Sequence, residues 1–136
     1  MRIFFILTLI FSALTCHAGD DLYRLMIPGK YILVGKALDS ETTYVGKVII
    51  EDDENGFKVT RMVADKLVIG NGTIESATDA KVLRIRFVED GLSYEQTCMV
   101  GSDLDNYARI SCYLYQPDIQ TMDPGLEVLF NEPAEA

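Results

Sequence analysis

The chain has 136 residues, of which 49% are hydrophobic, and its 21 acidic residues outnumber 12 basic ones to give a formal net charge of −9. This charge makes nucleic acid and anionic membrane surfaces poor partners, because both favour basic patches. The hydrophobic share and several apolar runs of strand length argue against a disordered chain. The length suits a single domain.

Residues 1–18 are typical of a secretory signal peptide. Arg2 supplies a charged start, and Ile3 to Leu14 form an apolar run of the length found in such signals. The run is shorter than the roughly 20 apolar residues of a membrane-spanning helix. We therefore predict cleavage after Ala18 and export to the periplasm or the medium, with no membrane span. The alternative is a lipid anchor on Cys16, since residues 13–16 loosely resemble a lipoprotein signal.

Cleavage at that point limits the available chemistry. It removes His17, the one histidine of the chain, and leaves two of the three cysteines. Without histidine, Ser-His-Asp and Cys-His catalytic arrangements are excluded, and zinc loses its usual ligand. We expect no catalytic residue, no metal and no cofactor.

The two remaining cysteines, Cys98 and Cys112, are expected to form a disulfide in an oxidising compartment. The chain-entropy model credits a closed loop of about 15 residues with about 3 kcal/mol. If the two cysteines face each other across a hairpin, the turn centres on Asp105.

Hydrophobic and polar residues alternate along most of the chain, which predicts strands with one buried face. The predicted strands cover residues 30–38, 43–51, 57–63, 66–75, 81–89, 92–100, 107–115 and 126–130. Within 66–75, Asn71-Gly72 could form a hairpin turn. We favour one continuous strand, because residues 76–79 already supply a turn.

Strands at this regular spacing predict an all-β, antiparallel up-and-down meander of about eight strands. Closure into a barrel, or near closure, would remove exposed edges, and a sandwich is the alternative. The domain would span residues 19–130, with a flexible tail at 131–136. Seven apolar residues would line the interior and could contact a ligand: Leu33, Ile50, Val59, Leu83, Ile85, Phe87 and Ile110.

The acidic segment 51–55 raises the question of a cation site. With Gly56 at position 6 of a calcium loop, position 12 is Met62, which cannot bind calcium through a carboxylate. Asn55-Gly56 is also a strong hairpin signal, so we favour a turn. Nearly all other acidic residues fall in predicted turns. Glu95 is the exception, and alternation places it on the outer face.

Seven tyrosines are a further feature, because tyrosine offers contact area with a polar tip. Most of them are expected to fill strands. Tyr113 and Tyr115 alternate away from Cys112 together with Arg109, so these three form a candidate outer binding surface.

Short motifs suggest a resemblance. Gly29-x-Tyr31-x-x-x-Gly35, Tyr44-x-Gly46-x-Val48-x-Ile50 and the closing Gly125-x-Glu127-x-Leu129 resemble those of small exported β-proteins of unassigned function. More loosely they resemble lipocalin-like (calycin) barrels, although Tyr31 stands where those proteins have tryptophan and no capping helix is evident. The resemblance implies a barrel with an unassigned or binding role, and it carries over no catalytic residue.

Three hypotheses for function follow. The first is a non-enzymatic exported protein that binds a small apolar ligand or a protein partner, since a barrel of eight strands can hold one small ligand. The second is an envelope or surface interaction or inhibitor protein with a filled core. The third, which we favour least, is a hydrolase that uses paired carboxylates.

Overall fold

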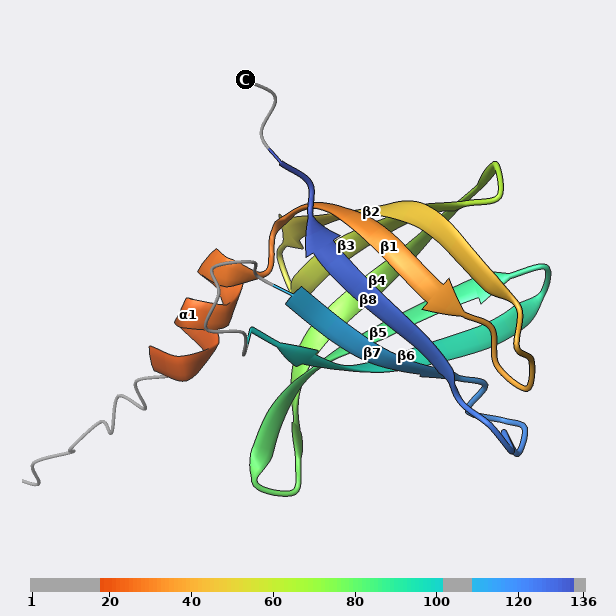
Figure 1. Cartoon of the computed structure of the whole chain (residues 1–136). Coiled ribbons are helices and arrows are strands. Elements are labelled where there is room, and N and C mark those ends of the chain that lie inside the picture. The colour runs from red at the N-terminus through yellow and green to blue at the C-terminus, as the bar shows by residue number, and fades with distance from the viewer. Residues whose placement is uncertain (1–17, 102–108, 134–136) are drawn as a thin grey trace, which may run out of the picture.

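A computed structural model describes residues 18–101 and 109–133 and shows one helix and a closed β-barrel (Figure 1). The elements are α1 (Ala18–Met26), β1 (Gly29–Lys36), β2 (Thr43–Asp53), β3 (Gly56–Val63), β4 (Lys66–Ala77), β5 (Ala80–Glu89), β6 (Leu92–Val100), β7 (Arg109–Tyr115) and β8 (Gly125–Asn131).

Each strand pairs antiparallel with the next one in the chain, and β8 returns to pair with β1. This confirms the predicted up-and-down meander and its closure as a lipocalin-like barrel rather than a sandwich. Closure is favourable because every strand then has two hydrogen-bonded neighbours and no edge is left exposed.

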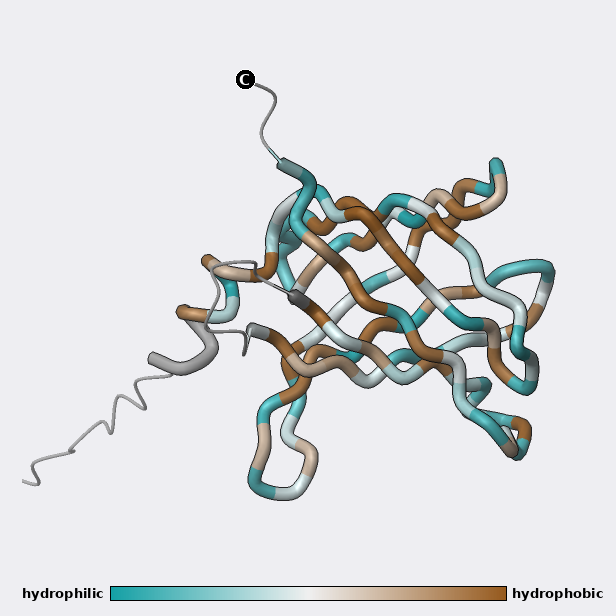
Figure 2. Tube along the Cα trace, viewed as in Figure 1, coloured by the Kyte–Doolittle hydropathy of each residue, from teal (hydrophilic) through white to brown (hydrophobic). Residues whose placement is uncertain are grey.

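Alternation along the strands separates an inner from an outer face, as Figure 2 shows in the changes between hydrophobic and hydrophilic colour. In β1, Tyr31 and Leu33 are buried inside, whereas Val34 is exposed outside. A strand's side chains point alternately to opposite faces, so the same period places one set of each strand in the core.

The core extends along the barrel interior from the end that carries α1. Its members are Ile27 and buried apolar side chains from every strand except β4, whose Gly70 and Gly72 face inward and leave room for larger neighbours. The largest fully buried members are Tyr31, Phe57, Ile27, Leu33, Ile50, Leu83, Ile85, Ile110 and Leu129.

Helix α1 lies at one end of the barrel, as Figure 1 shows, and it corrects the expectation that no capping helix is present. Tyr23 packs against the core, and Ile27, directly after the helix, is fully buried in it. The Tyr31 hydroxyl donates a 2.5 Å hydrogen bond to the Ile27 carbonyl, which fixes the start of β1 beneath the helix. We call this end of the barrel the closed end.

The turns agree with the sequence in most places. Val63 pairs with Lys66, so Ala64 and Asp65 form a two-residue turn, and both have positive φ, as a type I′ hairpin requires. Strand β4 runs straight through Asn71-Gly72, which confirms the single strand. The turn predicted in the acidic segment 51–55 is confirmed, because Asp53 pairs with Gly56 and leaves Glu54 and Asn55 as the two turn residues.

The disulfide joins Cys98 and Cys112 across β6 and β7, as predicted. The two residues are direct partners in the ladder, and both are buried inside the barrel. The register is therefore the one derived from the cysteine positions. The predicted turn around Asp105 lies outside the described residues.

Strand β8 extends through Asn131, and the Glu132 amide donates a 2.8 Å hydrogen bond to the Lys30 carbonyl. The start of the predicted tail is thus joined to β1, and residues 134–136 lie outside the described part. Within the described residues, no helix has the length and hydropathy needed to cross a bilayer.

Candidate functional site: a cup at the open end of the barrel

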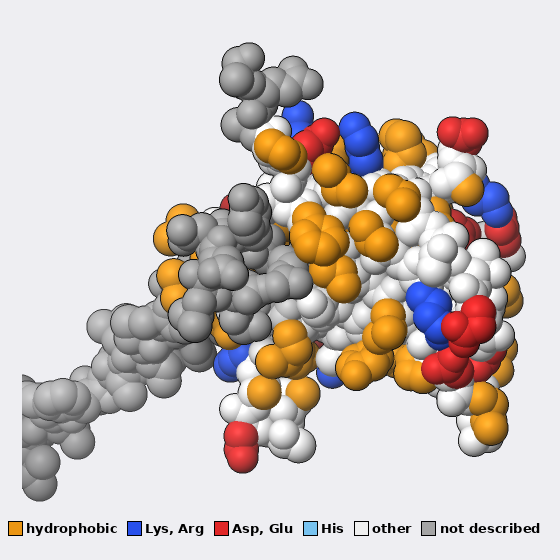
Figure 3. All heavy atoms as spheres, viewed as in Figure 1, with side chains coloured by type: hydrophobic (Ala, Val, Ile, Leu, Met, Phe, Trp, Pro, Cys, Tyr) orange, Lys and Arg blue, Asp and Glu red, His pale blue; other side chains and the backbone are white. Residues whose placement is uncertain are grey.

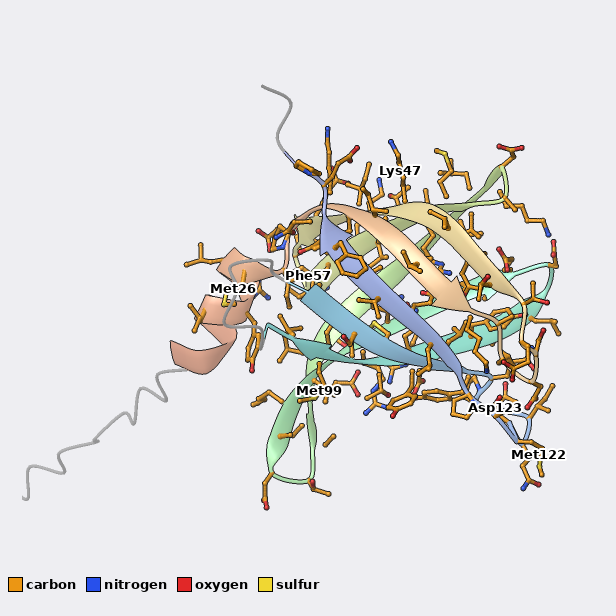
Figure 4. The ribbon with its side chains drawn as sticks, viewed as in Figure 1. Met26, Lys47, Phe57, Met99, Met122 and Asp123 are labelled. Atoms are coloured by element: carbon orange, nitrogen blue, oxygen red, sulfur yellow. A yellow bond between two sulfur atoms is a disulfide. The ribbon has the colours of Figure 1, made fainter. Side chains whose placement is uncertain are left out.

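A cup of about 390 Å³ opens at the end of the barrel opposite α1. This is the end that carries the β1–β2, β3–β4, β5–β6 and β7–β8 connections, and Figure 4 marks it by Met122 and Asp123, with Phe57 near the other end. The volume lies within the range of small-molecule sites. Its lining residues are Ala37, Leu38, Tyr44, Arg61, Val63, Ala64, Lys66, Phe87, Glu89, Tyr94 and Leu114.

The floor of the cup covers a buried ion pair between Arg61 and Glu127. Two hydrogen bonds of 2.7 Å join the guanidinium to the carboxylate, one from each terminal nitrogen to each oxygen. The side chain of Glu127 is fully buried and that of Arg61 is 8% exposed. A bidentate pair of this kind fixes both side chains in orientation as well as in distance.

Glu127 receives two further hydrogen bonds. The Tyr44 hydroxyl donates to one carboxylate oxygen at 2.6 Å, and the Gln96 amide nitrogen donates to the other. A carboxylate has about four acceptor positions, so Glu127 is saturated. Glu127 and its three partners come from four strands, β8, β2, β3 and β6. We call Tyr44, Arg61, Gln96 and Glu127 the floor cluster.

Arg61 and Glu127 each stabilise the charged form of the other. Burial by itself raises the pKa of Glu127, but the hydrogen bonds and charge of Arg61, with those from Tyr44 and Gln96, outweigh it and hold the pKa below its ordinary value. Burial opposes the charged form of Arg61 as well, and Glu127 more than compensates, so the pKa of Arg61 is raised. Burial and the Glu127 charge raise the pKa of Tyr44, which stays a neutral hydroxyl.

Aromatic rings form one wall above the floor. The Arg61 guanidinium carbon lies 4.3 Å from the centre of the Phe87 ring, in a cation–π contact. Phe87 and Tyr94 stack with their ring centres 5.3 Å apart and their planes inclined by 15°. These residues place flat apolar surface next to the buried cation.

A glycine makes room for the third ring. A Cβ atom added at Gly35 would lie 2.5 Å from the Tyr44 ring, which crosses the backbone of β1 at that point. Any larger residue at this position would push the ring aside. Gly35 therefore allows Tyr44 to reach Glu127.

The predicted lining residues divide between the core and the cup. Phe87 lines the cup. The other six pack in the buried core: Leu33, Ile50, Val59, Leu83, Ile85 and Ile110. All seven point inward as expected, and the space beside the six is occupied by their neighbours in the core cluster.

Two of the three predicted outer residues, Tyr113 and Tyr115, lie on the outer face of β7, alternating with buried Cys112 and Leu114. Tyr113 is 58% exposed, whereas Tyr115 is half-buried and its hydroxyl donates to Glu95 at 2.6 Å. Arg109 belongs to β7, but its side chain lies outside the described residues. Tyr115 belongs to an outer ladder of ion pairs in which Arg84 and Arg86 contact Glu75 and Glu95.

An apolar patch covers part of the outer face. Figure 3 shows hydrophobic side chains gathered over β1, β2 and β8. We define the outer patch as seven neighbouring positions of the β7–β8–β1–β2 ladders, none of them charged: Ile32, Val34, Val45, Tyr113, Leu126, Val128 and Phe130. Val34, Val45, Tyr113, Leu126 and Phe130 are exposed.

The acidic segment 51–55 is exposed at the closed end, where the Glu54 amide donates to the Asp53 carboxylate. Among residues 18–101 and 109–133, no three His, Cys, Asp or Glu side chains lie close enough to hold a metal ion. Glu95 lies on the outer face as predicted and is held by Arg86 and Tyr115.

Sequence reasoning missed the floor cluster. Its signal was a polar residue in phase with a buried apolar series: Arg61 follows Phe57 and Val59 at the same spacing, and Glu127 stands between Gly125 and Leu129. A charged residue at an inward position requires a partner, because an unpaired buried charge is costly. An arginine and a glutamate, each at an inward-facing position of its strand, were therefore the sequence signal that could have indicated a buried pair.

No protein-family model matches this chain, and no curated protein matches it significantly in sequence.

Proposed function

We propose that this protein is an exported, non-enzymatic binding protein that takes one small ligand into the cup. The observation that carries the proposal is the cup itself, about 390 Å³ in volume, with aromatic walls and a rigid polar floor. Binding sites for small molecules are characteristically concave, mostly apolar and provided with a few fixed polar groups. The disulfide is consistent with export, and the predicted signal peptide supports a periplasmic or secreted location.

The cost of the floor cluster supports a binding role. A buried ion pair is often no more stabilising than apolar residues of the same volume, so its presence requires another explanation. Here the pair lies beneath a cup rather than in the middle of the packed core. Its rigid orientation would give the cup selectivity at no further cost of ordering when a ligand binds.

The state of the carboxylates supports a role without catalysis. A general acid of a hydrolase needs a raised pKa. Glu127 is saturated with donors and its pKa is lowered. The pKa values of Glu75 and Glu95 are lowered as well, by arginine and hydroxyl partners that outweigh burial.

The proposal is tested with a neutral fluorescent probe, 6-propionyl-2-dimethylaminonaphthalene, whose emission shifts to the blue in an apolar site. We expect saturable binding with a blue shift. Val63→Trp fills the cup from β3 and should abolish binding, whereas Met62→Trp, on the outer face of the same strand, is the matched control and should retain it. Binding that is equal in both variants, or absent from the wild-type protein, refutes the proposal.

A second candidate function, interaction through the outer surface, is favoured by the outer patch. Contiguous exposed apolar surface on a soluble protein marks an interaction site. The occupant to which we commit is a second copy of this chain. The seven residues of the patch carry no charge, and the charged residues that pair with them at its border, Lys36, Lys47 and Arg109, are all basic. A two-fold contact therefore sets apolar surface against apolar surface without bringing the acidic residues of the two copies onto it. Sedimentation equilibrium should then show a dimer that Val34→Lys dissociates, and a monomeric wild-type protein would refute this candidate.

A further inference from the structure

We infer that the cup selects neutral ligands that carry a hydrogen-bond acceptor on a planar apolar body, and that Arg61 is the residue that reads the acceptor. This inference rests on the proposed function and specifies the class of ligand. It follows from the hydrogen-bonding capacity that the floor cluster leaves unused, from the charges around the cup and from the shape of its walls.

Arg61 holds donors that the floor cluster leaves unused, and the Tyr44 oxygen, which also lines the cup, keeps acceptor capacity. A guanidinium carries five N–H groups, and Arg61 directs two of them to Glu127. Glu127 has no acceptor position left, and the one proton of the Tyr44 hydroxyl is already donated to it. Arg61 also lines the cup, so its remaining N–H groups are the donors nearest to a ligand on the floor. A ligand that places an acceptor there forms a charge-assisted hydrogen bond.

The charges around the cup act against an anion. The positive charge of Arg61 is balanced by Glu127, and that of Lys66 at the rim is paired with Asp90 at 2.5 Å. Glu89 adds another carboxylate to the lining. A ligand carboxylate would therefore lose its water, meet an already neutralised arginine and share the cup with the Glu89 carboxylate.

The walls favour a flat apolar body. Phe87 and Tyr94 form a nearly parallel stack, and Tyr44 lies across Gly35 on another strand. Leu38, Val63 and Leu114 add aliphatic surface to the lining. Aromatic faces of this kind gain most from a ring that stacks or packs edge-on against them.

The test uses three probes that share one ring: ethylbenzene without an acceptor, acetophenone with a neutral carbonyl, and benzoate with a charged carboxylate. Binding is followed by ¹H–¹⁵N NMR titration of the whole exported protein, with shifts expected at cup residues. The ratio of the acetophenone and ethylbenzene affinities is compared between the wild-type protein and Arg61→Met/Glu127→Gln. This comparison cancels the difference in hydration of the two probes.

We expect the ratio to fall about tenfold in the double variant, as loss of one hydrogen bond to a charged donor implies. Benzoate should bind more weakly than acetophenone to the wild-type protein. Glu89→Gln should reduce this difference in affinity. Glu89→Gln is matched to the native residue in size, so its effect isolates the charge.

A second measurement needs no variant. The carbonyl carbon of ¹³C-labelled acetophenone should shift downfield on binding to the wild-type protein, because a guanidinium donor polarises the carbonyl. If none of the three probes moves cup resonances, the proposed function falls and this inference falls with it. If the probes bind in the cup but the ratio is unchanged and the carbonyl carbon does not shift downfield, the inference alone is wrong.

Discussion

Replacing Arg61 by methionine should destabilise the folded protein. It should also reverse the direction in which acid changes the contribution of Glu127 to stability. The substitution replaces the aliphatic stem of arginine with an unbranched apolar chain and removes the guanidinium with its two 2.7 Å hydrogen bonds to Glu127. Glu127 is then left as a carboxylate that is 1% exposed and has only the neutral donors Tyr44 and Gln96. Breaking a buried pair by removing one partner costs about 3–5 kcal/mol.

This loss can be compared with the total free energy of unfolding of a domain. Domains are stable by about 5–15 kcal/mol, so Arg61→Met should remove a large share of the free energy of unfolding. At about 4 °C per kcal/mol for a chain of this length, the Tm should fall by about 15 °C.

The contribution of Glu127 to stability should change with pH in opposite directions in the wild-type protein and in Arg61→Met. In the wild-type protein the folded pKa of Glu127 is below its unfolded value, so the pair contributes stability above the unfolded pKa and loses it as the pH falls through the folded one. In Arg61→Met burial is no longer compensated, and the folded pKa of Glu127 rises above the unfolded one. Acidification from pH 7 to pH 5 should therefore stabilise the variant relative to the wild-type protein.

Urea unfolding at pH 7 and pH 5, with the disulfide intact, measures both effects. Arg61→Met/Glu127→Gln is the control, because it also removes the Glu127 charge that the single variant leaves unpaired. It should recover most of the lost free energy of unfolding at both pH values. The reasoning is refuted if the single variant loses the same free energy at pH 5 as at pH 7, or if the double variant is as unstable as the single one.

Three further outcomes are expected. Gly35→Ala should lower the free energy of unfolding by about 1–3 kcal/mol, because its Cβ would lie 2.5 Å from the Tyr44 ring, and thermal unfolding that matches the wild type would contradict that contact. Reduction of Cys98–Cys112 should cost about 3 kcal/mol in urea titrations with and without reductant, and equal midpoints would speak against the bond. Lys47→Met removes an exposed ion pair with Glu132 at 3.4 Å and should leave the unfolding midpoint unchanged in low salt, in contrast to Arg61→Met; a clear loss would show that exposure does not separate the two pairs.

The sequence by itself determined the features that depend on neighbouring residues. Period-2 alternation predicted which residues of each strand point inward, and the paired turn residues Ala64-Asp65 and Asp90-Gly91 predicted where strands reverse. The register of β6 and β7 followed from Cys98 and Cys112, because a covalent bond between two strands fixes every other pairing in that hairpin. Local geometry is sufficient for such features, since the side-chain period of a strand is the same in any sheet.

Only the tertiary structure decided what the barrel interior contains. Arg61 and Glu127 are 66 residues apart, and Tyr44 and Glu127 are 83 apart, so no local pattern relates them. Closure of β8 onto β1 brings these strands around one interior, where each buried charge must find a partner because an unpaired buried charge is costly. The division between a packed interior and an open cup has the same origin: it depends on α1 and Ile27 filling one end, while at the other end the interior opens into the cup that Arg61 lines.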